Sequence, residues 1–140
     1  MSNHLLEIEG LTVGLPQSGD RADAVRDVGL HLDRGEILCI VGESGSGKSV
    51  TANAVMGLLP RQSLKVRAGR ILFDGADLLA LDAAGMRKIR GARIAMIFQE
   101  PMTSLNPVLT VGRQVAEVLE AHGAPGADHR ARVVELLAAV

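Results

Sequence analysis

The sequence is nearly devoid of aromatic residues. Its 140 residues contain no tryptophan, no tyrosine and two phenylalanines, Phe73 and Phe98. Surfaces that stack unpaired nucleobases are built from aromatic rings, so the composition argues against a protein that binds single-stranded nucleic acid. The hydrophobic content of 47% is therefore almost entirely aliphatic, which is typical of a core built from leucine, valine, isoleucine, alanine and methionine.

Strong net charge, paired cysteines and long apolar runs are also missing. The formal net charge of −1 offers no basic field for the closely spaced phosphates of DNA or RNA. The single cysteine, Cys39, cannot form an intramolecular disulfide, and its apolar surroundings predict a buried hydrophobe rather than a reactive thiol. No run approaches the ~20 apolar residues that span a bilayer, so we expect any membrane association to come through a partner.

Two kinds of strand pattern occur along the chain. Residues 6–13 and 25–32 alternate apolar and polar positions, apart from a slip at Gly10, which predicts strands with one covered face. Residues 36–41 and 94–98 are almost continuously apolar, which is typical of strands covered on both faces. We therefore expect the latter two to be central strands of a sheet.

Other segments predict a hairpin and several helices. A short strand at 70–73 ends at Asp74-Gly75, a dipeptide suited to a tight hairpin turn. Four segments are expected to be helices. The first is 48–59, which Pro60 ends, and the second is a short basic helix at 86–90. The third follows Thr110, with Val111, Val115, Val118 and Leu119 on one face, and the last is a helix that Asp128 can cap. The pattern predicts an α/β fold.

The most specific motif follows the apolar run at 36–41. Residues 42–49 match GxxxxGK[ST] in full, between a predicted buried strand and a predicted helix, which is the context that the phosphate-binding loop requires. Its glycines let the backbone close around an anion, so that amide N–H groups and the positive end of the next helix point inward. A flexible Gly/Ser linker is the alternative, but linkers seldom lie between a buried strand and a helix.

The loop residues have distinct expected roles in binding Mg²⁺ and a nucleoside triphosphate. Lys48 supplies a point charge to the β- and γ-phosphates, and the Ser49 hydroxyl can join the oxygen shell of Mg²⁺. A dinucleotide-binding fold is disfavoured because GxGxxG is absent. The residues predicted to hold the nucleotide are Gly42, Glu43, Ser44, Gly45, Ser46, Gly47, Lys48, Ser49 and Val50.

Three segments together resemble the ATPases of ABC transporters. They are GESGSGKSVT at 42–51, MRKIRG at 86–91 and RIAMIFQEPMTSLNP at 93–107, and the last resembles the Q-loop region of the importer branch for oligopeptides, dipeptides, nickel and glutathione. The resemblance covers nearly all of residues 6–140. It implies the N-terminal part of a P-loop NTPase domain, with an antiparallel β edge and a RecA-like core, incomplete at its C-terminus. By the same resemblance, residues 1–100 would form the nucleotide-binding α/β core with its phosphate loop at 42–49, and residues 101–140 would form the start of a truncated helical subdomain.

The resemblance also implies a site and a set of partners. Gln99 would contact Mg²⁺ and the attacking water, and its amide carries both an acceptor and donors. The segment after Gln99 would contact an integral membrane permease, and a second ABC ATPase subunit or domain would complete the ATP site. The implied location is peripheral, at the cytoplasmic face of the inner membrane. The implied function is ATP-driven uptake of peptides or related small solutes, without binding to nucleic acid.

The sequence departs from the ABC pattern in three respects. No aromatic residue precedes the loop to stack on adenine, and Leu15 stands near that place; Val50 replaces a common threonine; and no LSGGQ signature, Walker B Asp-Glu pair or switch histidine is visible. Without the signature loop and a carboxylate that positions water, phosphoryl transfer loses most of its positioning and charge stabilisation. We expect this chain alone to bind ATP and hydrolyse it negligibly. Two alternatives stay open: a truncated nucleotide-binding remnant without transport activity, and a DNA-associated ABC ATPase.

Overall fold

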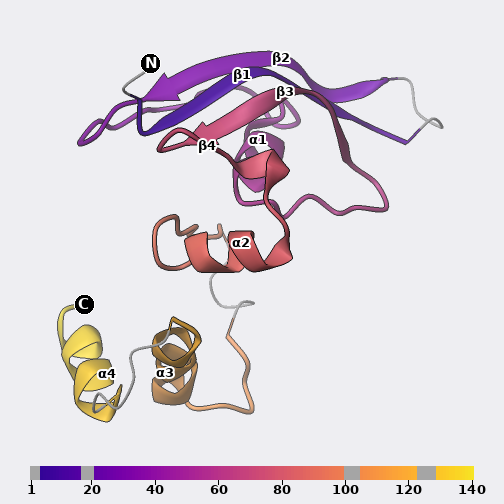
Figure 1. The fold of residues 1–140 in the computed structure, drawn as a ribbon. Coiled ribbons are helices and arrows are strands. Elements are labelled where there is room, and N and C mark those ends of the chain that lie inside the picture. Colours follow the sequence, from indigo (N-terminus) through magenta and orange to yellow (C-terminus); the bar gives the residue numbers. More distant parts are fainter. Residues whose placement is uncertain (1–3, 17–20, 100–104, 123–128) are drawn as a thin grey trace. The chain divides into compact units, whose positions relative to one another are not determined.

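A computed structural model describes residues 4–16, 21–99, 105–122 and 129–140. The chain divides into two compact units, Met1–Met86 and Arg87–Val140 (Figure 1). The division predicted from the sequence, between an α/β core at 1–100 and a helical subdomain at 101–140, stays a prediction.

The first unit is built on a four-stranded antiparallel sheet with the order β2-β1-β3-β4 (Figure 1). Its strands are β1 (Leu6–Gly14), β2 (Asp23–Leu32), β3 (Lys65–Phe73) and β4 (Ala76–Asp77). The two alternating segments predicted as strands are confirmed as β1 and β2, whereas β3 begins five residues earlier than the predicted segment at 70–73. The Asp74-Gly75 hairpin is also confirmed, because both residues have positive φ, 51° and 79°, and connect β3 to β4.

The slip at Gly10 is a β-bulge that keeps the core side chains of β1 on one face. Gly10 has a φ of 59°, and the pairing register of β1 shifts around it on both edges, between Ile8 and Leu11 against β2 and between Glu9 and Thr12 against β3. Because of this extra residue, Ile8, Leu11 and Val13 all point inward, with exposed fractions of 3%, 0% and 0%. The core of this unit is completed by Val25, Ala54, Val55, Met56, Ile71, Phe73, Leu78 and Met86.

Helix α1 (Lys48–Val55) contributes its C-terminal side chains to this core and lies against one face of the sheet (Figure 1). The helix is shorter than the predicted segment at 48–59. Its end is fixed by two backbone hydrogen bonds, from Gly57 N–H to the Ala54 carbonyl (3.0 Å) and from Leu58 N–H to the Asn53 carbonyl (2.8 Å). This pairing is a Schellman motif, so Gly57 rather than Pro60 ends the helix. A 3₁₀ turn, η1 (Leu78–Ala80), and helix α2 (Ala83–Ile89) follow β4, and α2 agrees with the short helix predicted at 86–90.

The prediction of two central strands at 36–41 and 94–98 is wrong for this structure. Neither segment forms a ladder with any residue that the structure describes, and Ile94 makes only an isolated bridge with Arg90. Ile37 and Val41 are each 90% exposed, and Ile97 is 94% exposed. A strand covered on both faces requires a hydrogen-bonded neighbour along each edge and packed layers above and below, and the described residues supply none of these. Cys39 is exposed for the same reason, so the prediction that it is buried is also wrong.

The second unit contains two helices that pack on each other, α3 (Val111–Ala121) and α4 (His129–Ala138). Thr110 caps α3, because its hydroxyl oxygen accepts a hydrogen bond from Arg113 N–H at 3.3 Å. Val133 of α4 is buried, whereas Val111 and Val118 of the predicted apolar face of α3 stay about half exposed. The predicted cap Asp128 lies outside the described residues. Across the described parts of the chain, no helix is both long enough and apolar enough to cross a membrane.

Candidate phosphate-binding site

The segment that matches the phosphate-loop motif is a compact turn between the apolar run at 36–41 and helix α1. Ser46 N–H donates to the Glu43 carbonyl at 3.2 Å, which folds the loop back on itself. Gly45 and Gly47 adopt positive φ values of 81° and 94°, a conformation that favours glycine. The backbone therefore reverses direction just before the first turn of α1.

The loop closes around the ammonium group of Lys48. This nitrogen donates to the carbonyl oxygens of Gly42 (2.7 Å) and Glu43 (2.8 Å), and lies 3.3 Å from the Ser46 hydroxyl. Lys48 is the first residue of α1, so its side chain turns back over the helix N-terminus. The geometry thus holds one positive charge at the mouth of the loop.

The N-terminus of α1 offers hydrogen-bond donors that no side chain satisfies. Its N-cap is Gly47, which carries no side chain for capping. Within the described residues, the backbone N–H groups of Lys48, Ser49 and Val50 have no hydrogen-bond partner. Unpaired amides at a helix N-terminus carry a partial positive charge and form a ready anion-binding site.

Gly47 also fixes the position of the loop against strand β2. A Cβ atom at Gly47 would lie 2.2 Å from Cγ1 of Val25 and 3.1 Å from the carbonyl oxygen of Ala24. Val25 is 6% exposed, so its side chain cannot move aside without disturbing the core. Glycine is therefore required here by close packing as well as by φ.

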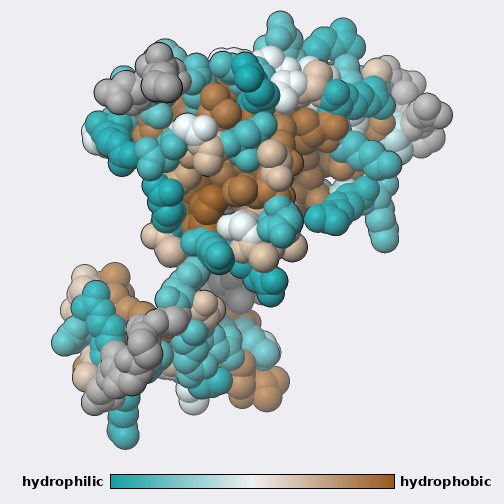
Figure 2. Space-filling model, viewed as in Figure 1, coloured by the Kyte–Doolittle hydropathy of each residue, from teal (hydrophilic) through white to brown (hydrophobic). Residues whose placement is uncertain are grey.

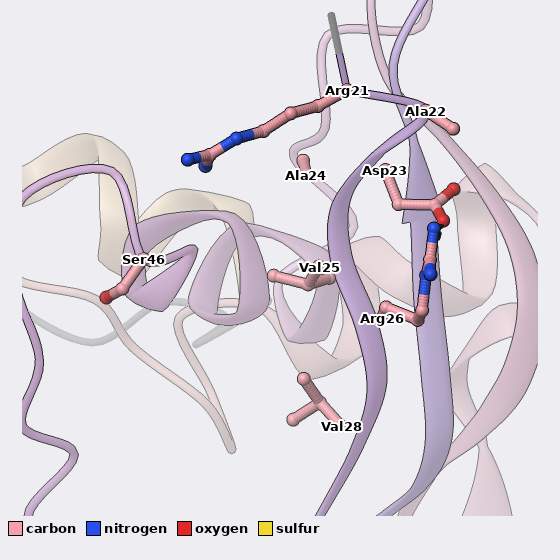
Figure 3. Close-up of a pocket in the computed structure, with 8 residues that line it drawn as sticks. All are labelled: Arg21, Ala22, Asp23, Ala24, Val25, Arg26, Val28 and Ser46. Carbon is pink, nitrogen blue, oxygen red and sulfur yellow. Dashed lines mark hydrogen bonds and ion pairs between the residues drawn. The ribbon is translucent and has the colours of Figure 1, made fainter.

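A cavity of about 460 Å³ lies between the beginning of β2 and the loop (Figure 3). It is lined by Arg21, Ala22, Asp23, Ala24, Val25, Arg26, Val28 and Ser46. Figure 3 shows the side chains of Asp23 and Arg26 reaching toward each other, while Arg21 extends away from them toward the side of Ser46. The cavity is therefore a direct extension of the phosphate loop, since Ser46 belongs to both.

The carboxylate of Asp23 is already neutralised by two guanidinium groups. Its oxygens accept hydrogen bonds from Arg26 Nε at 3.0 Å and from Arg67 at 3.1 Å, and the Asp23 side chain is 11% exposed. Arg67 also donates to the Leu15 carbonyl at 3.1 Å. Among the described residues, Arg21 makes no ion pair or hydrogen bond, in contrast to Arg26 and Arg67.

This cavity has no signature in the sequence, because it depends on how β2 packs beside the loop. The only available signal was the arginine that stands just before the alternating pattern at 25–32. Leu15, which the sequence placed near the adenine, lines a different cavity of about 400 Å³ together with Pro16, Gln62 and Arg67. Gln99 belongs to the second unit and is exposed, and its predicted role at Mg²⁺ stays a prediction.

The donor set fits Mg²⁺ held mainly by a nucleotide. No group of three or more histidine, cysteine, aspartate or glutamate side chains suited to a metal occurs among the described residues. Ser49 is exposed in the first turn of α1 and offers one hydroxyl oxygen beside the unpaired amides. Mg²⁺ keeps several waters and is commonly bound through substrate phosphates with one or two protein oxygens, so a single hydroxyl at this place is sufficient.

Curated relatives with similar sequences are ATP-binding proteins of transport systems. The chain is 51% identical to the peptidoglycan transport ATP-binding protein YejF of Agrobacterium fabrum, over 95% of this chain and 24% of that protein. It is 48% identical to the oligopeptide transport ATP-binding protein OppD of Bacillus subtilis, over 95% of this chain and 37% of that protein. The chain thus spans about a quarter to about a third of the length of these two relatives.

Solved structures and a family profile agree with these relatives. The ATP-binding cassette MJ0796, solved as a dimer bound to ADP and Pi, matches with a TM-score of 0.77 and 28% identity, over 95% of this chain and 56% of that chain. The profile described as "ABC transporter" matches residues 25–140, which include the loop, α1 and the segment around Gln99. The chain belongs to the ABC transporter family of ATP-binding proteins, and its 140 residues match the N-terminal part of a P-loop ABC cassette.

Proposed function

We propose that residues 42–50 bind the phosphates of Mg²⁺-ATP. The observation that carries this proposal is the set of unpaired amides at the N-terminus of α1, beside the ammonium group of Lys48. A polyphosphate satisfies these donors, and it replaces the hydrogen bonds from the Lys48 ammonium to neutral loop carbonyls with hydrogen bonds to negatively charged oxygens. Ser49 supplies a hydroxyl oxygen to Mg²⁺, which when bound neutralises charge on the β- and γ-phosphates.

Titration calorimetry with Mg²⁺-ATP tests the phosphate site. Removing the ammonium group in Lys48→Ala should weaken binding about 10- to 100-fold, because a hydrogen bond to a charged group contributes about 1.5–3 kcal/mol. Lys65→Ala is the matched control, since Lys65 is an exposed lysine of β3 in the same unit, and its loss should change the affinity less than about twofold. Equal affinities of the native chain and Lys48→Ala would refute the phosphate site.

The proposed biological role is that of an ATP-binding subunit of an importer for peptides or related small solutes. The names of its relatives support this role, since they include transport ATP-binding proteins for oligopeptides, dipeptides and glutathione. In this role the protein associates with the cytoplasmic face of the membrane through a permease, contacted by the segment after Gln99, and pairs with a second ABC ATPase subunit or domain. Gln99 positions Mg²⁺ and the attacking water.

Uptake of labelled di- and oligopeptides by cells that lack the gene tests this role. Uptake should fall on deletion and return with the wild-type gene, but not with Lys48→Ala. Unchanged peptide uptake after deletion, in cells without a second peptide importer, would refute the solute class while leaving the phosphate site intact.

The 140-residue chain alone is proposed to turn over ATP negligibly, since its sequence carries neither LSGGQ nor an Asp-Glu pair after an apolar strand.

A further inference from the structure

The cavity beside the phosphate loop is placed to receive the rest of a nucleotide. Ser46 forms part of its wall, and the neighbouring Gly47 packs directly against Val25 and the Ala24 carbonyl of β2. A ligand whose phosphates occupy the loop therefore has its next chemical group directed along the beginning of β2. The volume of about 460 Å³ is within the range of small-molecule sites.

The described wall of this cavity combines short aliphatic side chains with the guanidinium group of Arg21. Ala24, Val25 and Val28 provide apolar contact area, and Asp23 is held by Arg26 and Arg67. Arg21 has no partner among the described residues, and Figure 3 shows its extended side chain on the side of the cavity where Ser46 lies. Its guanidinium group is thus available to a ligand, whereas that of Arg26 is engaged.

No aromatic ring in the described part of the first unit can serve as a platform for a nucleobase. Phe73 is the one phenylalanine of that unit, which contains no tyrosine or tryptophan, and it is 6% exposed within the core. The imidazoles of His4 and His31 stack on each other at 4.2 Å, and neither lines the cavity. The base must therefore find a different flat surface if it is to be held by stacking.

We propose that the Arg21 guanidinium is the stacking surface for the base of the bound nucleotide, with Val25 and Val28 packing against the sugar and the base edge. The proposal rests on the proposed phosphate site. A guanidinium group is planar and weakly hydrated, and it stacks on aromatic faces and nucleobases. Every base has a π-face, and the other charged side chains of the described cavity wall, Asp23 and Arg26, are paired with each other. Arg21 therefore confers affinity with little discrimination between adenine and guanine.

Parallel titrations with Mg²⁺-ATP, Mg²⁺-GTP and Mg²⁺-tripolyphosphate separate base stacking from phosphate binding. Arg21→Ala should weaken ATP and GTP about tenfold, corresponding to a contact of about 1.4 kcal/mol, and leave tripolyphosphate within about twofold. Arg21→Trp should restore or exceed the native ATP affinity, because indole provides the flat surface. Arg21→Lys should stay weak, because an ammonium group has the charge without the plane.

The matched control is Arg26→Ala, which removes the same charge from the same cavity wall but takes away a side chain already paired with Asp23. It should change ATP affinity less than about twofold. Equal weakening of ATP and tripolyphosphate by Arg21→Ala would reduce Arg21 to a general electrostatic contact and overturn the stacking role. The stacking role would also be overturned if Arg21→Ala left the ratio of the ATP affinity to the tripolyphosphate affinity unchanged. A native chain that binds neither ligand would instead refute the phosphate site itself.

Discussion

The antiparallel sheet of the first unit and the apolar run at 37–41 have similar hydrophobic side chains in opposite environments. Leu11 and Val13 of β1 have exposed fractions of 0%, whereas Ile37 and Val41 are each 90% exposed. β1 pairs along its whole length with β2 on one edge and β3 on the other. The run at 37–41 pairs with no described residue. Figure 2 shows that apolar surface also reaches solvent over the middle of the first unit.

The difference shows what a strand pattern can and cannot specify. An alternating strand needs one covered face and a neighbouring strand. β1, β2 and β3 are neighbours in one sheet, and α1 lies against a face of that sheet, all within residues 6–73. A continuously apolar strand needs partners on both edges and layers on both faces. Without these, its backbone groups are left to water and its side chains form an exposed edge that favours association with other chains.

The largest expected effect is loss of the core contact made by Leu11. Leu11→Ala should reduce the free energy of unfolding by about 2–5 kcal/mol, because it removes a fully buried side chain and leaves a cavity between the sheet and α1. Urea unfolding followed by circular dichroism measures this change. A loss below about 1 kcal/mol would mean that the core around β1 is not packed as described.

The matched substitution in the uncovered run is Ile37→Ala. It should change the free energy of unfolding by less than about 0.5 kcal/mol, because a side chain that is 90% exposed loses little on truncation. If Ile37→Ala reduced the free energy of unfolding as much as Leu11→Ala does, the two segments would not differ in burial, and the run at 37–41 would be covered in solution.

The single thiol of the chain provides a direct probe of the same run. Cys39 is exposed, so a thiol-specific reagent should modify it in the folded chain within about threefold of the rate in the urea-unfolded chain, since reactivity follows access. Because the chain has one cysteine, no substitution is needed and the signal has one source. Protection that disappears only on unfolding would contradict the exposure, and protection that appears only at high protein concentration would show that a second copy covers the run.

The parts of the fold that sequence patterns predicted are those whose partners lie nearby along the chain. The alternation in β1 and β2 and the Asp74-Gly75 hairpin are local signals, and the structure confirms them. The predicted strands at 36–41 and 94–98 depend on neighbours that are distant along the chain. Their apolar pattern indicates that they need covering layers and paired edges, but it does not show which residues provide them. Gly57, which stops α1, is a common helix terminator that the sequence also offered, but the prediction ended the helix at Pro60 instead.

For the candidate site, the motif specified the loop but not what adjoins it. GxxxxGK[ST] predicts the turn, the ammonium position and the start of α1 from residue types alone, because each is a property of consecutive residues. The cavity lined by Arg21 and Ser46 joins positions 25 residues apart through the packing of Val25 on Gly47. No spacing rule places that arginine beside the loop, and only the tertiary structure relates the two.

The smallest expected effect concerns the junction between the paired sheet and the uncovered run. His4, just before β1, hydrogen-bonds through Nδ1 to Asp33 at 2.5 Å, and Asp33 belongs to the turn that leads from β2 into that run. The hydrogen bond to the Asp33 carboxylate raises the pKa of His4 above its ordinary value, and the negative charges of Asp33, Glu7 and Glu36 act in the same direction, while desolvation opposes them. His31 stacks on the His4 ring from the adjacent strand.

A histidine whose pKa is raised on folding stabilises the folded state in its protonated form. This contribution is complete below the unfolded pKa of about 6.5 and is lost as the pH rises through the higher folded value. His4→Gln should therefore destabilise the chain more at pH 5.5 than at pH 8.5 in urea unfolding. Asp33→Asn should reduce the same pH dependence, because it removes the carboxylate that hydrogen-bonds to His4 while Glu7 and Glu36 remain. Equal destabilisation by His4→Gln at both pH values would mean that the protonated pair does not anchor the turn.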